Sequence, residues 1–286
     1  MYASSMALDT PESHLRWIEH RERSLRDPDG WLALVALHWL PSGRSTICAV
    51  GETAGDRLVL PGALASPAVT FEFETPRLLV VPGREVTATL DGRPLPADEP
   101  TELRDDRTGP GPVLRFGRLH VTHVHRQHRA ALRVRDREAA SLMRFRGVPR
   151  FPFDPTLVVD ARFEPAPPDT TVPITLITEH VEEHPVAGTL RFEIGGRSCS
   201  LLAEQSGNGL FVVFGDSTNI APGEDGTYGG GRFLSLAAPD PTGRVEIDFN
   251  RAVNPPCSFT PYATCPTPPA ANRLPMPVRA GERRTH

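Results

Sequence analysis

The chain has 286 residues, of which 39% are hydrophobic and 23% charged, an ordinary balance for a globular protein of one large or two modest domains. Its net charge of −4 argues against a nucleic-acid-binding surface and against attraction to an anionic membrane. All 31 basic residues are arginine, which excludes a Schiff-base lysine, a Ser-Lys dyad and a phosphate-loop lysine.

The N-terminal segment, residues 1–41, predicts one helix and an apolar anchor. Thr10 and Pro11 suit the N-cap and the first helical position, and apolar residues then recur at helical spacing as far as a turn cluster at 27–30. The apolar run at 31–40 predicts either a buried strand or a short helix. This run is far shorter than the roughly 20 residues of a membrane helix, and no signal-peptide pattern precedes it. We therefore expect a cytoplasmic protein without a membrane partner.

Residues 42–164 predict a first β module. Short apolar runs alternate with Gly, Pro and Asp at roughly ten-residue spacing, which is typical of a sandwich or barrel. Asp91-Gly92 indicates a tight hairpin turn. The expected strands are 58–60, 69–73, 78–81, 86–90, 114–116, 119–125 and 132–134.

A Pro-rich linker after a bridging strand predicts the start of a second β module, residues 165–286. Gly195-Gly196 indicates a tight turn between two of its strands. The expected strands are 173–177, 189–194, 198–202, 210–214, 232–236 and 245–249. The predicted fold class is therefore mainly β, with two consecutive antiparallel modules, sandwich-like or barrel-like, behind an N-terminal helix.

One histidine pattern resembles a zinc site. His180 and His184 match the H-x-x-E-H motif of inverted zinc peptidases, which functions only on a helix, where residues four apart share a face. Here the preceding residues are strand-like and Pro185 follows directly. In an extended segment the two histidines would lie about 13 Å apart, too far for one metal ion.

A second group of histidines lies at His120, His123, His125 and His128. His123 and His125 would share one face of a strand, as cupin metal ligands do, but a cupin-type Glu and a second histidine motif are missing. They are weak metal candidates, and we expect no cofactor.

The main candidate site is the set of polar residues at the strand ends of the second module, around a Pro-rich loop from Gly243 to Arg273. Loops of this kind, held on rigid strands, often carry function. The candidates for acid–base or nucleophilic chemistry are Asp216, Asp248, Cys257 and Tyr262. The candidates for ligand binding are Thr218, Tyr228, Arg232, Asn250, Arg251, Asn254, Asn272 and Arg273.

Alternatively, the same residues have structural roles: the Asp and Asn side chains cap loop amides, the Arg side chains pair with Asp, and the cysteines are small buried residues. Cys257 and Cys265 are expected to be reduced thiols.

These residues also carry a family resemblance. The chain resembles the uncharacterised bacterial family known as domain of unknown function 1684 in FGDSTNIAPGEDGTYGGGRFL, in GRVEIDFNRAVNPPCSFTPYATCPTPPAANRL and in the closing AGE. WLALVALHWLPSG at 31–43, LRVRD at 132–136 and RFRGVPRFPFDP at 144–155 also resemble that family, so the resemblance spans nearly the whole chain. Val253 stands where that family suggests Tyr, and the histidine-rich HVTHVHRQH replaces a strand with Arg and Gly. The family implies a fold and a site location but no reaction. The strand layout of 43–135 is also loosely similar to a forkhead-associated sandwich, although the Gly-Arg and Ser of a phosphothreonine pocket are not evident.

Two functions are therefore expected. The first is an enzyme or ligand-binding protein whose C-terminal β module recognises a small anionic or carbonyl-bearing metabolite, because arginine suits carboxylate and phosphate groups. On this hypothesis Arg251 and Arg273 matter more for function than the histidines. The second is a non-catalytic interaction module of two β domains with a structural C-terminal loop.

Overall fold

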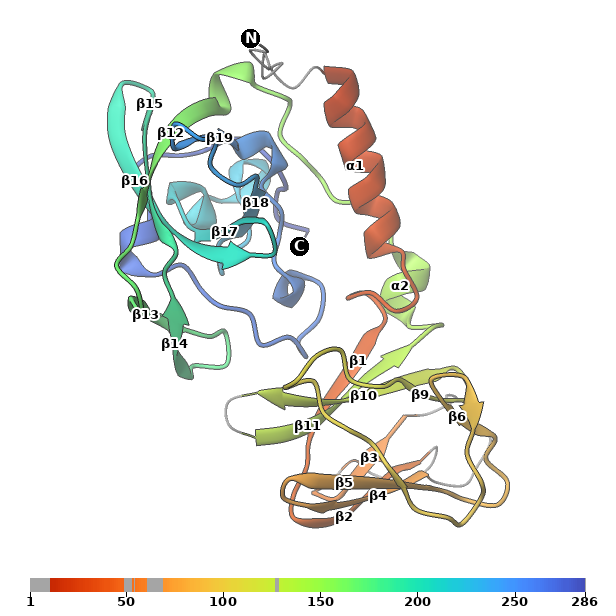
Figure 1. Ribbon diagram of the computed structural model, residues 1–286. Helices are drawn as coiled ribbons and strands as arrows, with labels where there is room; N and C mark the ends of the chain where they lie inside the picture. The colour runs from red at the N-terminus through yellow and green to blue at the C-terminus, as the bar shows by residue number, and fades with distance from the viewer. Residues whose placement is uncertain (1–10, 49–52, 54, 61–68, 127–128, 286) are drawn as a thin grey trace. The chain divides into compact units, whose positions relative to one another are not determined.

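The computed structural model describes residues 11–48, 53, 55–60, 69–126 and 129–285 (Figure 1). The chain divides into two compact units. One, the N-terminal sandwich, comprises Ser24–Phe145; the other, the C-terminal unit, combines the N-terminal helix as far as Arg23 with the chain from Arg146 onward. His128 and the predicted N-cap Thr10 lie outside the described residues.

The N-terminal sandwich has a six-stranded and a five-stranded sheet. The six-stranded sheet has the order β1-β11-β10-β9-β6-β7, and the five-stranded sheet has the order β3-β2-β4-β5-β8. The strands are β1 (Leu34–Trp39), β2 (Gly43–Cys48), β3 (Arg57–Val59), β4 (Val69–Glu74), β5 (Arg77–Pro82), β6 (Ala88–Leu90), β7 (Arg93–Pro94), β8 (Thr101–Glu102), β9 (Leu114–Phe116), β10 (Leu119–Arg126) and β11 (Arg129–Asp136). The short helix α2 (Ala140–Arg144) follows.

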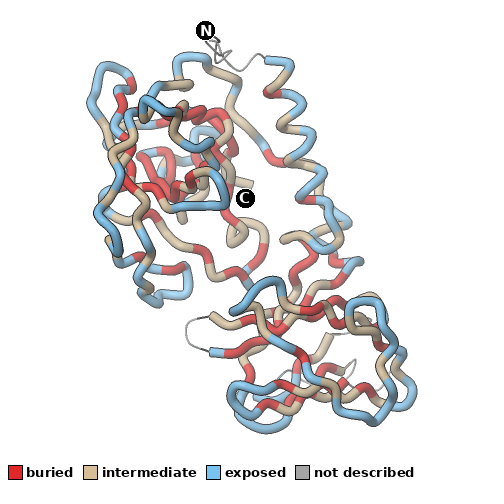
Figure 2. The backbone as a smooth tube through the Cα atoms, viewed as in Figure 1, coloured by how far each residue is buried: buried red, intermediate tan, exposed pale blue. Residues whose placement is uncertain are grey.

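Alternation along the strands builds a single core between these two sheets. In β4, Val69, Phe71 and Phe73 are buried while the residues between them are not, as a strand with one face inward requires. Side chains from both sheets, such as Phe71 and Phe116, belong to one hydrophobic cluster. Full burial of one such side chain contributes about 1.5–3 kcal/mol. Figure 2 shows buried positions alternating with less buried, mostly intermediate ones along these strands.

The C-terminal unit contains a six-stranded sheet of order β18-β17-β16-β15-β12-β19 and a separate hairpin, β13-β14. Its strands are β12 (Val158–Pro165), β13 (Thr171–Thr175), β14 (Val181–Pro185), β15 (Gly188–Ile194), β16 (Arg197–Ser206), β17 (Gly209–Phe214), β18 (Arg232–Leu236) and β19 (Arg244–Asp248). Its helix α1 spans Pro11–Leu25, with the last two residues assigned to the sandwich. Its 3₁₀ turns are η1 (Pro155–Leu157), η2 (Ser217–Ile220), η3 (Gly223–Asp225), η4 (Phe249–Arg251), η5 (Pro256–Ser258) and η6 (Ala270–Asn272).

The long strand β16 pairs with a different neighbour along each of its two parts. Its first part, as far as Ala203, pairs with β15, whereas Glu204 to Ser206 pair with β17. The inner side carries the core, with Leu190, Phe192 and Phe214 at most 5% exposed. The outer side of β15 therefore presents its alternate, polar residues to solvent.

The predicted mainly β fold is confirmed, with α1 as the one long helix of the described residues. The apolar run after Gly30 contains the strand β1 rather than a helix. Both predicted hairpin turns have the positive φ angles that glycine favours, 81° at Gly92 and 55° and 73° at Gly195 and Gly196. Within the described residues, no helix is long and apolar enough to cross a membrane.

The two units are divided differently from the predicted ranges 1–41, 42–164 and 165–286. Strand β12, up to Pro165, pairs with both β15 and β19, so the bridging segment is a central strand of the C-terminal sheet. The helix α1 likewise groups with the C-terminal unit. The physical reason lies in their contacts. The helix α1 contacts residues more than a hundred positions away, and β12 pairs with strands that lie beyond the Pro-rich linker. Local composition reveals neither kind of contact.

Candidate functional site

Two of the predicted site residues form a buried ion pair. Arg232 at the start of β18 is fully buried, and one of its terminal nitrogens lies 2.5 Å from Asp216 Oδ2. The guanidinium also donates to the carbonyl oxygens of Val278 and Ala280 and lies 4.9 Å from the Phe214 ring centre. Burial lowers the pKa of Arg232, while the neighbouring carboxylate opposes that shift. This pair connects the segment of Val278 and Ala280 to the start of β18.

Asp216 also begins the turn η2. Its carboxylate accepts a hydrogen bond from Thr218 N at 2.8 Å, and Asn219 Oδ1 accepts one from Asp216 N, which completes a capping box. Thr218 is 1% exposed, and its hydroxyl lies 2.7 Å from that of Thr227. Both Asp216 and Thr218 are therefore bonded within the fold.

The three predicted asparagines join segments that are distant in sequence. Asn272 donates to the carbonyl oxygens of Leu202 and Val213 and accepts from Leu202 N, so its amide bridges β16 and β17 where these strands separate. Asn250 donates to Asp154 O and accepts from Asp154 N, both at 2.9 Å. Asn254 Nδ2 donates to Arg283 O at 2.8 Å. All three are at most 2% exposed, which makes them internal connectors.

The two predicted arginines of the Pro-rich region differ in their surroundings. Arg251 is 38% exposed, forms an ion pair with Asp248 at 3.2 Å and lies 5.9 Å from the Trp17 ring centre. Asp248 in turn caps η4 by accepting from Asn250 N. Arg273 is exposed, and its guanidinium has no hydrogen bond or ion pair with another described residue.

Cys257 and Cys265 of the Pro-rich loop lie together with Tyr228, and both cysteines carry free thiols. Tyr228 Oη donates to Cys257 O at 3.2 Å, and Cys257 N donates to Cys265 Sγ at 3.3 Å. The hydrogen bond from the Cys265 side chain lowers the pKa of the Cys257 thiol, whereas burial raises that of the Tyr228 hydroxyl. Tyr262 is 38% exposed on the same loop.

Glu282 is a buried charge that the sequence did not single out as a site residue. It is 0% exposed and forms ion pairs with Arg21 of α1 at 3.0 Å and with Arg150 at 2.9 Å. Its other oxygen accepts from Asn254 N at 2.6 Å. Gly281 makes this approach possible, since its φ is 73° and a side chain there would collide with Ala252 O. The Ala-Gly-Glu motif near the C-terminus was the available signal.

The histidines of the two sequence patterns make separate contacts in the structure. His184 lies on the extended strand β14, where its Nδ1 is 3.2 Å from Glu204, so the H-x-x-E-H residues are not helical. His123 and His125 share the inward face of β10, and His123 Nδ1 lies 2.9 Å from Leu103 O. Among the described residues, no three His, Cys, Asp or Glu side chains are grouped to hold a metal ion.

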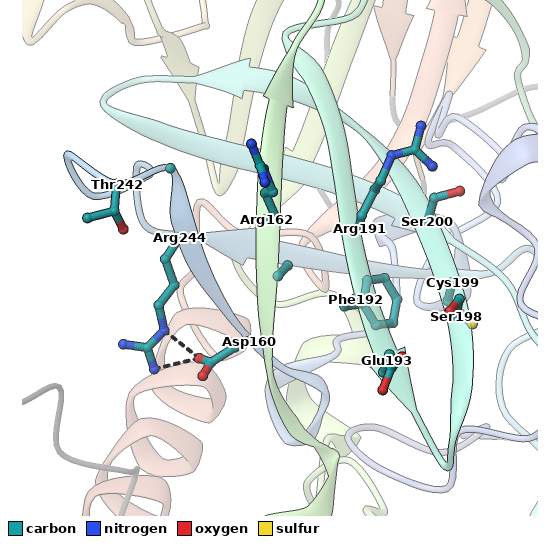
Figure 3. A pocket seen from close by; sticks show the side chains of 12 residues that line it. Asp160, Arg162, Arg191, Phe192, Glu193, Ser198, Cys199, Ser200, Thr242 and Arg244 are labelled. Carbon is teal, nitrogen blue, oxygen red and sulfur yellow. Dashed lines mark hydrogen bonds and ion pairs between the residues drawn. The ribbon is translucent and has the colours of Figure 1, made fainter.

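A solvent-open hollow of about 760 Å³ lies on the outer face of the same unit's main sheet (Figure 3). Three arginines stand in one row across it, since Arg162 of β12 is paired in register with Arg244 of β19 and with Arg191 of β15. Ser200 of β16 continues the row beside Arg191. Like charges directly opposite one another destabilise a sheet, so this row needs compensating charges.

Carboxylates compensate the two outer arginines. Arg244 bonds to Asp160 through two nitrogens, at 2.8 and 2.5 Å, and Arg191 bonds to Glu164 at 2.6 Å. The middle residue, Arg162, has no hydrogen bond or ion pair with any described residue. Glu193, which also lines the hollow, is exposed and lacks such a partner among the same residues.

Sequence reasoning missed Arg162 and Glu193, although a signal was present. The tripeptide Arg-Phe-Glu occurs in both β12 and β15, at 162–164 and 191–193, with the charged residues on the face opposite the phenylalanine. Predicted strands with charges on alternate positions indicate an exposed charged face. The register that aligns the arginines could not be read from the sequence.

Comparison with known proteins agrees with the C-terminal motifs. Residues 143–283 match the model of the family described as protein of unknown function, DUF1684. Among solved structures, the chain is similar to the solution NMR structure of the uncharacterized protein from gene locus rrnAC0354 of Haloarcula marismortui. The two are 30% identical, the match covers 49% of this chain and 77% of that chain, and the TM-score is 0.39. The comparison with curated proteins found no match. The expected resemblance is thereby confirmed, and the chain belongs, through residues 143–283, to the DUF1684 family of proteins of unknown function.

Proposed function

We propose that the C-terminal unit is a ligand-binding module that recognises a small anionic metabolite at the hollow formed by β12, β15, β16 and β19. The observation that carries the proposal is the pair of uncompensated opposite charges, Arg162 and Glu193, on a surface where the neighbouring arginines are matched by carboxylates. A ligand whose anionic group lies on Arg162 and whose hydrogen-bond donor or cation lies on Glu193 would satisfy both.

The chemistry of Arg162 suits a carboxylate or a phosphate. Its planar guanidinium can donate two parallel hydrogen bonds to either group, and the flanking Arg191 and Arg244 add positive potential from both sides. The hydroxyl of Ser200 in the same row can donate or accept a further hydrogen bond. Because the hollow is open to water, each charged contact is partly screened.

The lining favours binding over catalysis. Burial raises the pKa of Cys199, so its thiol is protonated at neutral pH and is a poor nucleophile. Ser198 and Ser200 have no hydrogen bond to a histidine or other base among the described residues. We therefore assign recognition to the hollow and no covalent step.

The experiment is a thermal-shift screen of the protein against a library of carboxylates, phosphates and amino acids, followed by calorimetric titration of the compounds that stabilise it. Arg162→Gln should weaken binding by about five- to tenfold, the range for a partly exposed charged contact. Arg197→Gln is the matched control, because Arg197 is an exposed arginine of the same sheet, on β16, that does not line the hollow.

Glu193→Gln tests the second half of the proposal. It should weaken the binding of amino acids, which carry an ammonium group, and leave the affinity for their N-acetylated forms unchanged. If Arg197→Gln weakens binding as much as Arg162→Gln, or if no anionic compound stabilises the protein, the proposal is wrong.

The interaction module remains a second candidate, and the six- and five-stranded sheets that share one core in residues 24–145 favour it. A forkhead-associated-like role predicts binding of phosphothreonine peptides, measured by fluorescence polarisation. Such binding would be unaffected by Arg162→Gln, which separates the two functions.

A further inference from the structure

A second pocket, of about 260 Å³, lies at one end of the N-terminal sandwich. Its lining comes from the end of β10, the start of β11, the turn after β4 and the segment between β8 and β9. Phe73 and Leu40 give it an apolar wall, and His123 is its most buried polar residue, at 1% exposure. The mouths and ends of β-sandwiches and barrels are common ligand sites.

The protonation of His123 follows from its contacts. Its Nδ1 lies 2.9 Å from Leu103 O, and because a carbonyl oxygen only accepts hydrogen bonds, Nδ1 carries the proton. Burial lowers the pKa of His123, which keeps the ring neutral at pH 7. Its Nε2 is then a hydrogen-bond acceptor, and this buried atom has no partner among the described residues. The Phe73 ring packs edge-on against the imidazole, with the two ring centres 6.2 Å apart, and limits rotation of the imidazole.

One positively charged residue of the pocket lining, Arg129, is not paired with a carboxylate of the described residues. Asp105 and Arg107 form an ion pair at 2.6 Å, so their charges cancel. Arg129 is exposed, lines the pocket and stacks over the Trp39 ring at 4.5 Å, without an ion pair to any described residue. With Asp105 and Arg107 paired, Arg129 supplies an uncompensated positive charge to the lining, which complements a monoanion.

The volume bounds the size of the ligand. A cavity of about 150 Å³ holds a benzene ring, so 260 Å³ corresponds to a ligand of roughly ten non-hydrogen atoms. The apolar wall suits a compact hydrocarbon portion.

We propose that this pocket binds a small monoanionic hydroxy acid, whose O–H donates to His123 Nε2 and whose anionic group lies against Arg129. The site is in the N-terminal sandwich and does not depend on the function proposed for the hollow of the C-terminal unit. The role of His123 is recognition of a donor, which a buried acceptor without a partner requires.

The test uses two pairs of acids that differ only in the hydroxyl group: mandelate with phenylacetate, and 2-hydroxyisocaproate with isocaproate. In calorimetric titrations of the full chain, at least one hydroxy acid should bind about tenfold or more tightly than its deoxy partner, because the partner leaves Nε2 unpaired. Equal affinities within both pairs, or no binding by any of the four acids, would overturn the proposal.

His123→Asn provides the sharpest variant. The asparagine Nδ2 can still donate to Leu103 O, whereas the acceptor at Nε2 is removed. The hydroxy acid should then bind as weakly as its deoxy partner, whose own affinity should not change. An undiminished preference for the hydroxy acid in His123→Asn would contradict the assignment.

Arg129→Gln tests the anion contact at the exposed mouth, where a folding defect is not expected. It should weaken both members of a pair by the same factor and preserve the preference for the hydroxy acid. This variant decides the question if His123→Asn fails to fold, since unchanged affinity for both acids would overturn the proposed orientation. Arg162→Gln, in the other unit, should have no effect on these titrations.

Discussion

Buried charged residues in the C-terminal unit are held by partners of opposite charge, and this determines their roles. Asp216 with Arg232, and Glu282 with Arg21 and Arg150, are ion pairs in which the acid side chain is fully buried. Removing one partner from such a pair is strongly destabilising because the remaining charge stays buried without compensation.

The first prediction concerns Asp216→Asn. This change leaves the Arg232 guanidinium without its counter-charge and should lower the free energy of unfolding by about 3–5 kcal/mol, measured by urea denaturation. The control is Asp225→Asn, because Asp225 forms a solvent-exposed pair with Arg279, at 63% and 57% exposure. That variant should lose less than about 1 kcal/mol. Equal losses of unfolding free energy in the two variants would show that the buried pair stabilises the fold no more than the exposed pair does.

For individual residues, the sequence indicated which polar side chains are important but not what each of them does. Asp216, Arg232, Asn250 and Asn272 were recognisable as an unusual polar set, but the sequence left open whether they line a cleft or support the fold. The difference depends on burial, and burial depends on strands and loops that meet from distant parts of the chain. Glu282 shows the same limit, since an acid near the C-terminus gives no local sign of being buried.

At the scale of elements, the hairpin β13-β14 is connected to the main sheet through a titrating contact. His184 of β14 lies 3.2 Å from both carboxylate oxygens of Glu204 on β16, with Glu182 3.9 Å away. The hydrogen bond to Glu204 raises the pKa of His184. A histidine whose pKa is higher in the folded state stabilises the fold below its unfolded pKa of about 6.5, and this stabilisation is lost as the pH rises through the folded pKa.

The second prediction is that His184→Gln removes this pH dependence. Wild type should exceed the variant in unfolding free energy by about 1 kcal/mol at pH 5.5, and the difference should shrink by pH 8.5. Denaturant unfolding at the two pH values measures it. His180→Gln is the control on the same hairpin, since His180 has no ion pair with a described carboxylate. A wild-type advantage that grows with pH would reverse the assigned sign.

Strands with alternating apolar residues were predicted almost to the residue, as β4, β10 and β18 show. The strand β14, Val-Glu-Glu-His-Pro, escaped prediction because its hairpin is largely exposed and has no apolar alternation. The position of β12 in the middle of the C-terminal sheet depends on pairing with β15 and β19, which a local pattern cannot specify. The aligned arginines of the hollow are a consequence of that pairing.

At the scale of the molecule, the N-terminal helix belongs to the unit formed by the C-terminal half. Arg21 of α1 bonds to Glu282 and to Asn254 O, and its guanidinium lies 5.8 Å from the Phe259 ring centre. Arg150 bonds to the same Glu282 and lies 5.3 Å from the ring centre of Trp17 on α1. These contacts span up to 261 positions of sequence.

The third prediction concerns Glu282→Gln. The neutral amide leaves two arginines without their carboxylate, so we expect a loss of about 3–5 kcal/mol and a faster exchange of the α1 backbone amides. Hydrogen exchange followed by mass spectrometry measures the helix directly, with Glu12→Gln as the control because Glu12 is an exposed acid on the same helix. Unchanged exchange in α1 would contradict the proposed role of Glu282 in holding the helix.

The most direct test of anion recognition by the C-terminal unit is an NMR titration of the isotope-labelled protein with the anionic compound that stabilises it best in the thermal-shift screen. The largest chemical-shift changes should occur at Arg162, Glu193 and Ser200 and should be lost in Arg162→Gln but retained in Arg197→Gln. Changes centred instead on Arg251 and Arg273 would move the ligand to the Pro-rich loop that the sequence first indicated. That outcome would contradict the assignment of the hollow.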